Sequence, residues 1–280
     1  MRVVEYVSQT GLPMVFDNDD DFGALPPGSA GARNYGGLRG KRRLEAIRAM
    51  ALAADVVTAP SRALVERFEA YGVHRAALLE NYVADETVFL RRGQRPGQLV
   101  IGWIAGKEHH LDADALPIAP TLERILRVHE HVELRTIGLR LPIKHDRYLH
   151  VDGIPFARLP AALAGWDLGM APLADIPFSR ARSNIKLKEY AILGIPWLAS
   201  SVGEYVGLGA REGGRMVADG DWFEALNWLI THDAHRRRLA RRAAKWGAGQ
   251  TINQHAYRWE KLLHELVGAR TADPVDVTLA

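Results

Sequence analysis

The sequence predicts an α/β protein made of two Rossmann-like domains, the first of them truncated. Short apolar segments alternate with helix-length amphipathic segments from residue 12 to residue 200, an order that is typical of parallel strands joined by crossover helices. A polar segment at residues 91–98, RRGQRPGQ, interrupts this alternation and is the best candidate linker between the domains. The composition, 48% hydrophobic and 25% charged over 280 residues, indicates a globular protein with two modest cores.

The first domain is expected at residues 1–95. Ser61 is a typical helix N-cap and Gly72 a typical helix stop. About three strands are fewer than such a domain normally contains, so we expect a shortened sheet. The strands are predicted at residues 12–17, 55–60 and 75–81, and the main helices at residues 41–53 and 61–71.

The second domain is expected at residues 96–250 and has enough units for a complete doubly wound sheet. Residues 251–280 are predicted as a helix that returns toward the first domain, followed by a frayed tail. Strands of the second domain are predicted at residues 99–104, 132–138, 148–154, 167–173 and 195–200, and helices at residues 117–128, 159–164 and 184–193, with only helices after residue 200.

The composition excludes several kinds of protein. A chain without cysteine forms no disulfides and no thiolate metal sites. No apolar stretch approaches the ~20 residues of a membrane span, so we expect none and take the cytoplasm as the default location. Basic runs at residues 39–48 and 235–246 contain apolar residues at helical spacing, which favours solvated helix faces over phosphate-binding patches. No nucleic-acid recognition motif accompanies them.

Residues 166–200 carry the most informative pattern. A buried strand ends at Pro172, a polar loop contains Arg180 and Arg182, and a helix opens at Ser183 or Asn184. In open α/β sheets ligands bind at the carboxyl ends of strands, where a helix N-terminus presents free N–H groups to a phosphate. The segment therefore predicts a diphosphate site.

Three side chains of this helix are spaced to face one ligand. Ser183, Lys186 and Glu189 stand at i, i+3 and i+6, which spreads them over about 120° of the helix surface. Taken singly, the serine is also explained as an N-cap and the two charges as a solvated stripe.

Taken together, the segment resembles the donor site of the glycosyltransferase family 4 group, which has the GT-B fold. In that group a strand ending in a Pro-Leu pair, a polar loop, a helix with a glutamate and a GIP-type turn recur in this order. The resemblance implies that Glu189 binds the ribose of a nucleotide sugar. The family's usual first glutamate falls on Ala181 here, so either Ser183 and Lys186 take over its role or activity is weak or lost.

Two further stretches resemble the same family. Residues 54–89 are similar to the end of its N-terminal domain, and residues 99–110 to the first strand and glycine loop of its donor domain. The resemblance implies that Gly102, Gly106 and Lys107 lie beside the phosphates, and we expect the loop with His109 and His110 to face the cleft. In all it covers residues 12–266.

An acidic cluster, DNDDDFG at residues 17–23, follows the first expected strand. Its carboxylates can line the cleft and meet acceptor hydroxyls, or they can face water in a turn. A metal site is the least favoured of the three interpretations.

The sequence thus predicts a transfer of a sugar from a nucleotide diphosphate sugar to an acceptor hydroxyl; the resemblance implies retention of configuration. The alternative is a catalytically decayed nucleotide-sugar-binding or scaffold protein. The partners are the donor and an unidentified acceptor, with no cofactor required, and a homodimer through residues 1–48 covers the short sheet. The candidate catalytic residues are Lys186, Asp19, Asp20 and Asp21; the candidate donor-binding residues are Gly102, Gly106, Lys107, His109, His110, Arg180, Arg182, Ser183, Asn184, Lys186 and Glu189; no metal ligands are predicted.

Overall fold

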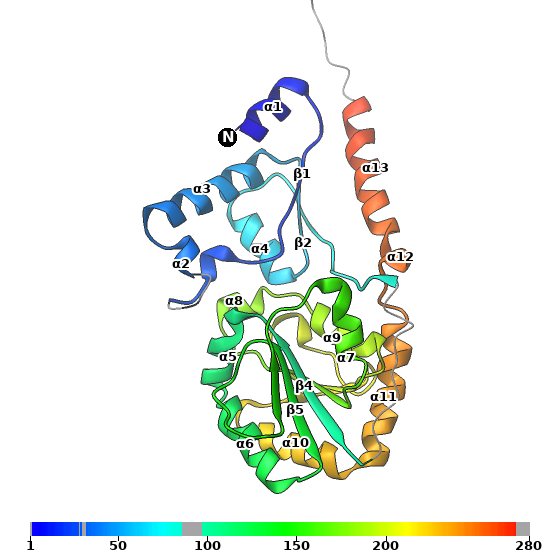
Figure 1. The fold of residues 1–280 in the computed structure, drawn as a ribbon. Helices are drawn as coiled ribbons and strands as arrows, with labels where there is room; N and C mark the ends of the chain where they lie inside the picture. Colours follow the sequence, from blue (N-terminus) through cyan, green and yellow to red (C-terminus); the bar gives the residue numbers. More distant parts are fainter. Residues whose placement is uncertain (1, 28, 30–31, 86–96, 273–280) are drawn as a thin grey trace, which may run out of the picture.

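The computed structural model describes residues 2–27, 29, 32–85 and 97–272, and shows two regions, each built on its own parallel sheet (Figure 1). The first sheet has three strands in the order β1-β2-β3, and the second has six in the order β6-β5-β4-β7-β8-β9. The predicted α/β class is therefore confirmed. The predicted linker at residues 91–98 lies almost wholly outside the described residues.

The first region has its core between the sheet and two helices. Leu64 and Phe68 of one helix and Ala51 of another pack on Val57 of the central strand. Ser61 caps its helix as predicted, because its hydroxyl accepts a hydrogen bond from the N–H of Leu64 at 3.2 Å. The elements are α1 (Arg2–Thr10), β1 (Val15–Asp17), η1 (Phe22–Ala24), α2 (Ala32–Tyr35), α3 (Gly37–Ala53), β2 (Val56–Ala59), α4 (Arg62–Ala70) and β3 (Ala76–Leu78).

The second region is larger and includes every strand that was predicted for it. Its elements are β4 (Leu99–Ala105), η3 (Lys107–His109), α5 (His110–Ala115), α6 (Ile118–Val128), β5 (Val132–Gly138), β6 (Tyr148–Val151), η4 (Phe156–Arg158), α7 (Leu159–Leu163), β7 (Leu168–Ala171), α8 (Pro177–Arg180), α9 (Ile185–Ile192), β8 (Trp197–Ser200), η5 (Gly203–Tyr205), β9 (Gly214–Val217), η6 (Asp219–Asp221), α10 (Trp222–Thr231) and α11 (Asp233–Gly247).

The central strands of the six-stranded sheet are buried on both faces, whereas the edge strand β6 exposes Leu149 and Val151. Leu99, Ile101 and Trp103 of β4 point to a core shared with α6 and α10, whereas Val100 points to a second core shared with α7 and α9. This alternation is the period of two expected of a strand covered by helices on both sides. The large ring of Trp103 is fully buried, and burial of one such side chain contributes about 1.5–3 kcal/mol.

The expectation of helices only after residue 200 was wrong. Strand β9 extends the sheet beyond β8, with Gly214 paired to Trp197. A Cβ on Gly214 would lie 2.0 Å from the ring of Trp197, so the strand depends on a close packing contact. Its four residues also include the exposed Arg215, so the segment has too few apolar residues in sequence to be predicted as a strand. The loop expected before α9 likewise contains a short helix, α8.

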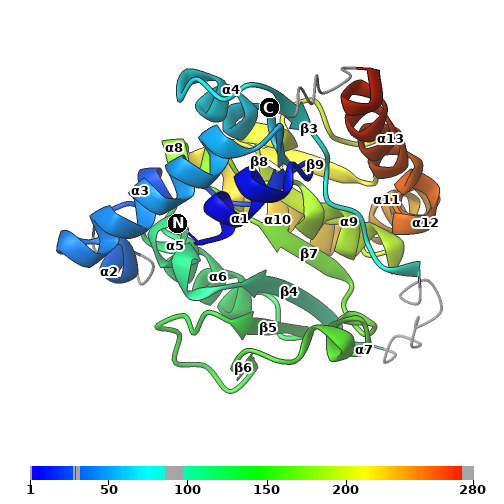
Figure 2. The same ribbon diagram turned by 90° about the horizontal axis from the view of Figure 1, so that it is seen from above.

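The chain returns to the first region at its end. Helices α12 (Ile252–His255) and α13 (Tyr257–Ala272) rise from the second region beside the first (Figures 1 and 2). Glu265 of α13 forms an ion pair with Arg75 at 2.8 Å, next to β3. No helix among the described residues combines the length and apolar character needed to cross a membrane.

Candidate active site

The site lies where the strand order of the large sheet reverses. Strands β4 and β7 pair only at Ile101–Leu168 and Gly102–Gly169, and the order corresponds to the 3-2-1-4-5-6 arrangement of doubly wound sheets. Beyond those pairs the hydroxyl of Tyr190 bridges the two strands. It donates to the carbonyl of Met170 at 2.9 Å and accepts from the N–H of Ile104 at 3.1 Å. Ligands of such sheets bind outside the carboxyl ends of the strands at this point.

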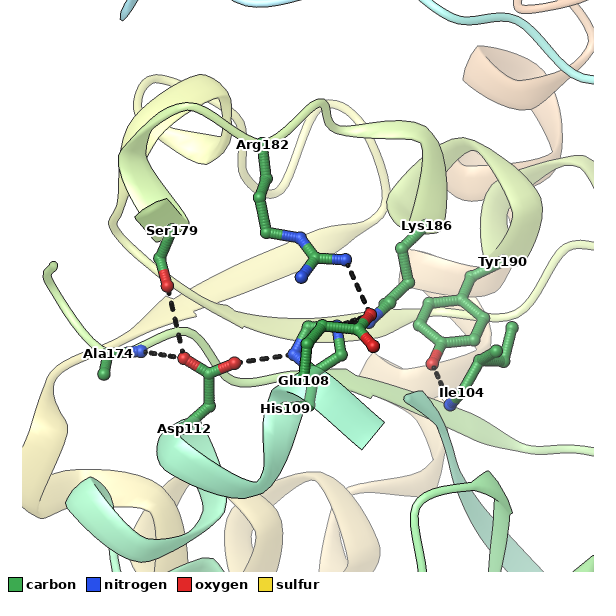
Figure 3. Close-up of polar contacts among 9 residues, drawn as sticks. All are labelled: Ile104, Glu108, His109, Asp112, Ala174, Ser179, Arg182, Lys186 and Tyr190. Carbon is green, nitrogen blue, oxygen red and sulfur yellow. Dashed lines mark hydrogen bonds and ion pairs between the residues drawn. The ribbon is translucent and has the colours of Figure 1, made fainter. Parts of the chain in front are cut away.

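A chain of polar contacts starts at Lys186, in the first turn of α9 (Figure 3). Its Nζ lies 2.9 Å from Nε2 of His109, and Nδ1 of His109 lies 2.6 Å from the carboxylate of Asp112. Asp112 also accepts from the N–H of Ala174 at 2.7 Å and the hydroxyl of Ser179 at 3.3 Å. The loops after β4 and β7 are thus held together beneath the lysine.

Arg182 lies on the same side of the cluster. Its Nη2 donates to Oε1 of Glu108 at 3.1 Å, and that oxygen is 3.9 Å from Nε2 of His109. Arg182, Lys186 and the start of α9 therefore place two cations and a positive helix end in one small space (Figure 3).

The titration of this cluster follows from its burial. Burial, together with the nearby Arg182, lowers the pKa of Lys186 to about 7. Burial and the neighbouring Lys186 hold the pKa of His109 well below its usual value, so the ring is neutral. A neutral ring that donates from Nδ1 to Asp112 accepts from Lys186 at Nε2. Burial opposes ionisation of Glu108, but Arg182, a backbone hydrogen bond and Lys186 together outweigh burial and keep the pKa of that carboxyl below its usual value.

Glu189, one turn beyond Lys186, lines a shallow apolar hollow with a free volume of about 10 Å³, roughly the space of one water molecule. Val83 and Leu159 line the hollow, and Phe156, 64% exposed, stands at its rim. Burial raises the pKa of Glu189 to about 7, while Lys186 acts in the opposite direction.

The acidic cluster of the first region divides into two parts. Asp19 and Asp20 face the second region: Asn81 donates to Asp19 at 3.2 Å and to Ser183 at 3.4 Å. Burial raises the pKa of Asp20, with Arg182 opposing the rise. Asp21 turns away from the second region.

Asp21 serves the local fold. Its carboxylate accepts from the N–H of Gly23 at 3.1 Å and pairs with Arg67 at 2.9 Å, and it is 6% exposed. We therefore assign Asp21 to the support of the turn and no longer count it among the candidate catalytic residues.

Several donor-site candidates lie apart from the cluster. Gly102 is buried in mid-strand, where a Cβ would lie 1.9 Å from Trp166, so packing explains this glycine. Arg180 is exposed and pairs with Asp175 at 2.6 Å. His110 begins α5, and the side chain of Lys107 lies outside the part of the chain that the structure describes.

Helix α9 has its N-cap one residue later than the interpretation in which Ser183 is the N-cap. Asn184 is the N-cap and makes no side-chain capping bond, whereas Ser183 precedes it and contacts Asn81. Ser183 is therefore not the N-cap of α9.

Ala181, at the position of the family's first glutamate, is buried between the regions. It is 2% exposed and packs in the core cluster of the first region with Leu64. Its carbonyl accepts a hydrogen bond from the hydroxyl of Ser61 at 2.6 Å. A glutamate there would bury a charge in this interface.

Sequence reasoning missed Glu108, Asp112 and Asn81. The spacing of His109 and Asp112 within one helical turn, directly after a strand, is a signal that could have identified the pair. Nothing local marks Asn81. Among the described residues no group of three or more His, Asp or Glu side chains is arranged to hold a metal ion.

The fold is that of solved GT-B glycosyltransferases. Sucrose-phosphate synthase from Thermosynechococcus elongatus matches with a TM-score of 0.70 and 14% identity, over 95% of this chain and 71% of that one. Anabaena Alr3699/HepE in complex with UDP and glucose matches with a TM-score of 0.65 and 15% identity, over 93% of this chain and 74% of that one. A UDP-forming α,α-trehalose-phosphate synthase from Burkholderia vietnamiensis matches with a TM-score of 0.66 and 12% identity, over 96% of this chain and 71% of that one.

The likeness confirms the predicted GT-B fold. No family model matches the sequence, and no curated protein matches it.

Proposed function

We propose that this protein is a glycosyltransferase that uses a nucleotide diphosphate sugar. The observation that carries the proposal is the convergence of Arg182, Lys186 and the start of α9 at the switch point of the large sheet. A helix N-terminus with two cations suits a diphosphate. HepE, which shares the fold, has been solved with UDP and with UDP-glucose, which supports a nucleotide sugar as donor.

The donor lies along the helix in this proposal. The diphosphate contacts Arg182, Lys186 and the backbone of Gly106, and Ser183 supplies a hydroxyl. The ribose hydroxyls donate to Glu189, and the base lies over the mouth of the shallow apolar hollow beside it, against the exposed ring of Phe156.

The chemistry is a substitution at the anomeric carbon. The bond from that carbon to the diphosphate breaks, the acceptor oxygen bonds to the carbon, and the acceptor proton passes to the leaving diphosphate. Arg182 and Lys186 stabilise the negative charge that develops on the leaving group. Asp20, and Asp19 beside it, accept a hydrogen bond from the acceptor hydroxyl. The family resemblance favours retention of configuration.

In this proposal the two regions bind different substrates. We assign residues 1–95 to the acceptor, residues 96–250 to the donor and residues 251–280 to the return of the chain. The acceptor is unidentified, the reaction uses no cofactor, and the cytoplasm is its location.

Donor binding tests the proposal. A thermal-shift screen with UDP, GDP, TDP and ADP identifies the nucleotide, since a ligand that binds only the folded state raises the melting temperature. With that nucleotide, calorimetry on Glu189→Ala should show a loss of about 1.5–3 kcal/mol in binding, as for a hydrogen bond to a charged group. Glu123→Ala, on α6, is the control and should bind as the wild type does. Unchanged affinity in folded Glu189→Ala contradicts the assignment.

A second candidate is a nucleotide-sugar-binding protein that has lost catalysis. The burial of Ala181 between the regions favours it, because a side chain that normally helps to hold the donor is replaced by a packing contact. Donor hydrolysis separates the two functions. A binding-only protein protects the sugar–diphosphate bond, whereas a transferase cleaves it slowly in water.

A further inference from the structure

Glu108 places a carboxylate directly against the cations of the proposed donor site. Its Oε1 lies 3.1 Å from Arg182 and 3.9 Å from His109, the residue that contacts Lys186 at 2.9 Å (Figure 3). The side chain is 33% exposed, so this contact is within reach of solvent. A negative charge therefore already neutralises part of the positive charge there.

The same carboxylate packs closely against the backbone of Gly106, which has no side chain. A Cβ built on this glycine would lie 2.2 Å from Oε2 and 2.4 Å from Oε1 of Glu108, so any other residue would displace the carboxylate. Gly106 follows the last residue of β4, where a glycine lets an anionic group approach the main chain closely. Glu108 thus occupies the space between the glycine backbone and Arg182.

We infer that Glu108 occupies the anion position of the site and that a diphosphate binds by displacing it. This inference rests on the proposed function for the identity of the anion. Glu108 is then a specificity-determining residue. A diphosphate, which carries several negative charges, competes well with one carboxylate for Arg182 and Lys186. A singly charged anion competes poorly, so the site discriminates against it.

The test is the isosteric change Glu108→Gln, with binding measured by calorimetry at about pH 6.5, where Lys186 is mostly protonated. UDP and inorganic pyrophosphate are the probes. Both should bind roughly tenfold more tightly to the variant, a change equivalent to 1.4 kcal/mol. Glu108→Asp keeps the charge but draws the carboxylate back from Arg182, so its affinities should lie between those of the wild type and Glu108→Gln.

The matched control is Glu123→Gln on α6. It removes the same charge from a glutamate of nearly equal exposure, 34%, at the other end of the second region (Figure 1). Its affinities should not change. An equal gain in this control would mean that net charge alone strengthens binding, and would overturn the inference.

The remaining outcomes separate the two claims. Tighter pyrophosphate binding to Glu108→Gln, with no nucleotide bound by any variant, upholds the role of Glu108 and overturns the proposed function. UDP binding that is unchanged or weaker in Glu108→Gln upholds the function and overturns the inference. A selective loss of UDP-glucose binding would also overturn it, because Glu108 would then hold the sugar. If no probe binds any variant, both fail.

Discussion

The two regions of this protein achieve stability in different ways. The second region buries a six-stranded sheet between two helix layers, with Trp103, Trp197 and Trp222 fully enclosed. The first region has three strands, and its core cluster includes Ala181, a residue of the second region. A small sheet buries little apolar surface of its own. The comparison indicates that the first region depends on its contacts with the second region.

One group of those contacts involves α9, the helix that carries the proposed donor site. Lys188 of α9 is 1% exposed and donates to Glu80 at 2.8 Å and to the carbonyl of Asn81 at 2.9 Å. Its ammonium also lies 4.1 Å from the ring centre of Tyr82. Residues 80–82 follow β3 at the end of the first region, so these contacts fix α9 to the first region.

The largest effect is expected from breaking this joint. Lys188→Met removes the buried ammonium from Glu80, which keeps only a longer ion pair with Arg258 at 3.8 Å. The loss of its charged hydrogen bonds should lower the free energy of unfolding by about 2–3 kcal/mol. Urea denaturation measures the loss. The control Lys261→Met removes a lysine that is 76% exposed and should change stability by less than about 0.5 kcal/mol. Equal losses would show that Lys188 does not join the regions.

A second prediction separates stability from function within the first region. Asp21→Asn should lower the free energy of unfolding by about 1–2 kcal/mol, because it weakens the bonds to Arg67 and Gly23. Asp20→Asn should leave stability nearly unchanged, since burial already disfavours its charge, but should slow transfer roughly tenfold. Donor affinity should stay the same. A loss of donor affinity, or activity that depends on added divalent cations, would instead indicate a cation site.

The pH dependence of donor binding sharpens the role of the second region. Lys186 has a pKa of about 7 in the free protein, and a bound diphosphate favours its protonated form. Affinity for UDP-glucose, titrated by calorimetry, should therefore be greatest below pH 7 and fall by up to about tenfold per unit above it. Lys186→Arg stays protonated and should flatten the profile. The same slope in that variant would assign the titration to another group, such as Glu189.

The smallest effect concerns self-association through residues 1–48. Within the described residues β1 pairs only with β2, and Val3, Tyr6 and Leu38 are exposed nearby. Light scattering should give twice the 31.0 kDa monomer mass at micromolar concentration, and Leu38→Glu should restore the monomer. A wild-type monomer would show that docking on the second region suffices.

Much of the fold follows from local patterns. The apolar periods of β2, β4 and β5 and the N-cap at Ser61 predicted elements that the structure confirms. Gly72 adopts a φ of 83°, the left-handed conformation expected of a helix stop. Such signals depend on neighbours in the chain, so one sequence is enough to read them. Strand β9 was not predicted because its position depends on a contact with Trp197 rather than on a pattern of apolar residues in its own sequence.

The sequence by itself determined the α/β class, the order of most elements and the placement of Lys186 and Glu189 on one helix. Tertiary structure alone decided which charges meet. Glu108 and Arg182 are 74 positions apart, and Glu80 and Lys188 are 108 apart. The first pair forms because the carboxyl ends of β4 and β7 bring two loops to one edge of the large sheet. The second pair forms across the contact between the two regions. The pattern of apolar residues does not predict these ion pairs. Each partner lies in a loop or helix that forms from its own neighbours in the chain, whether or not the other partner is present.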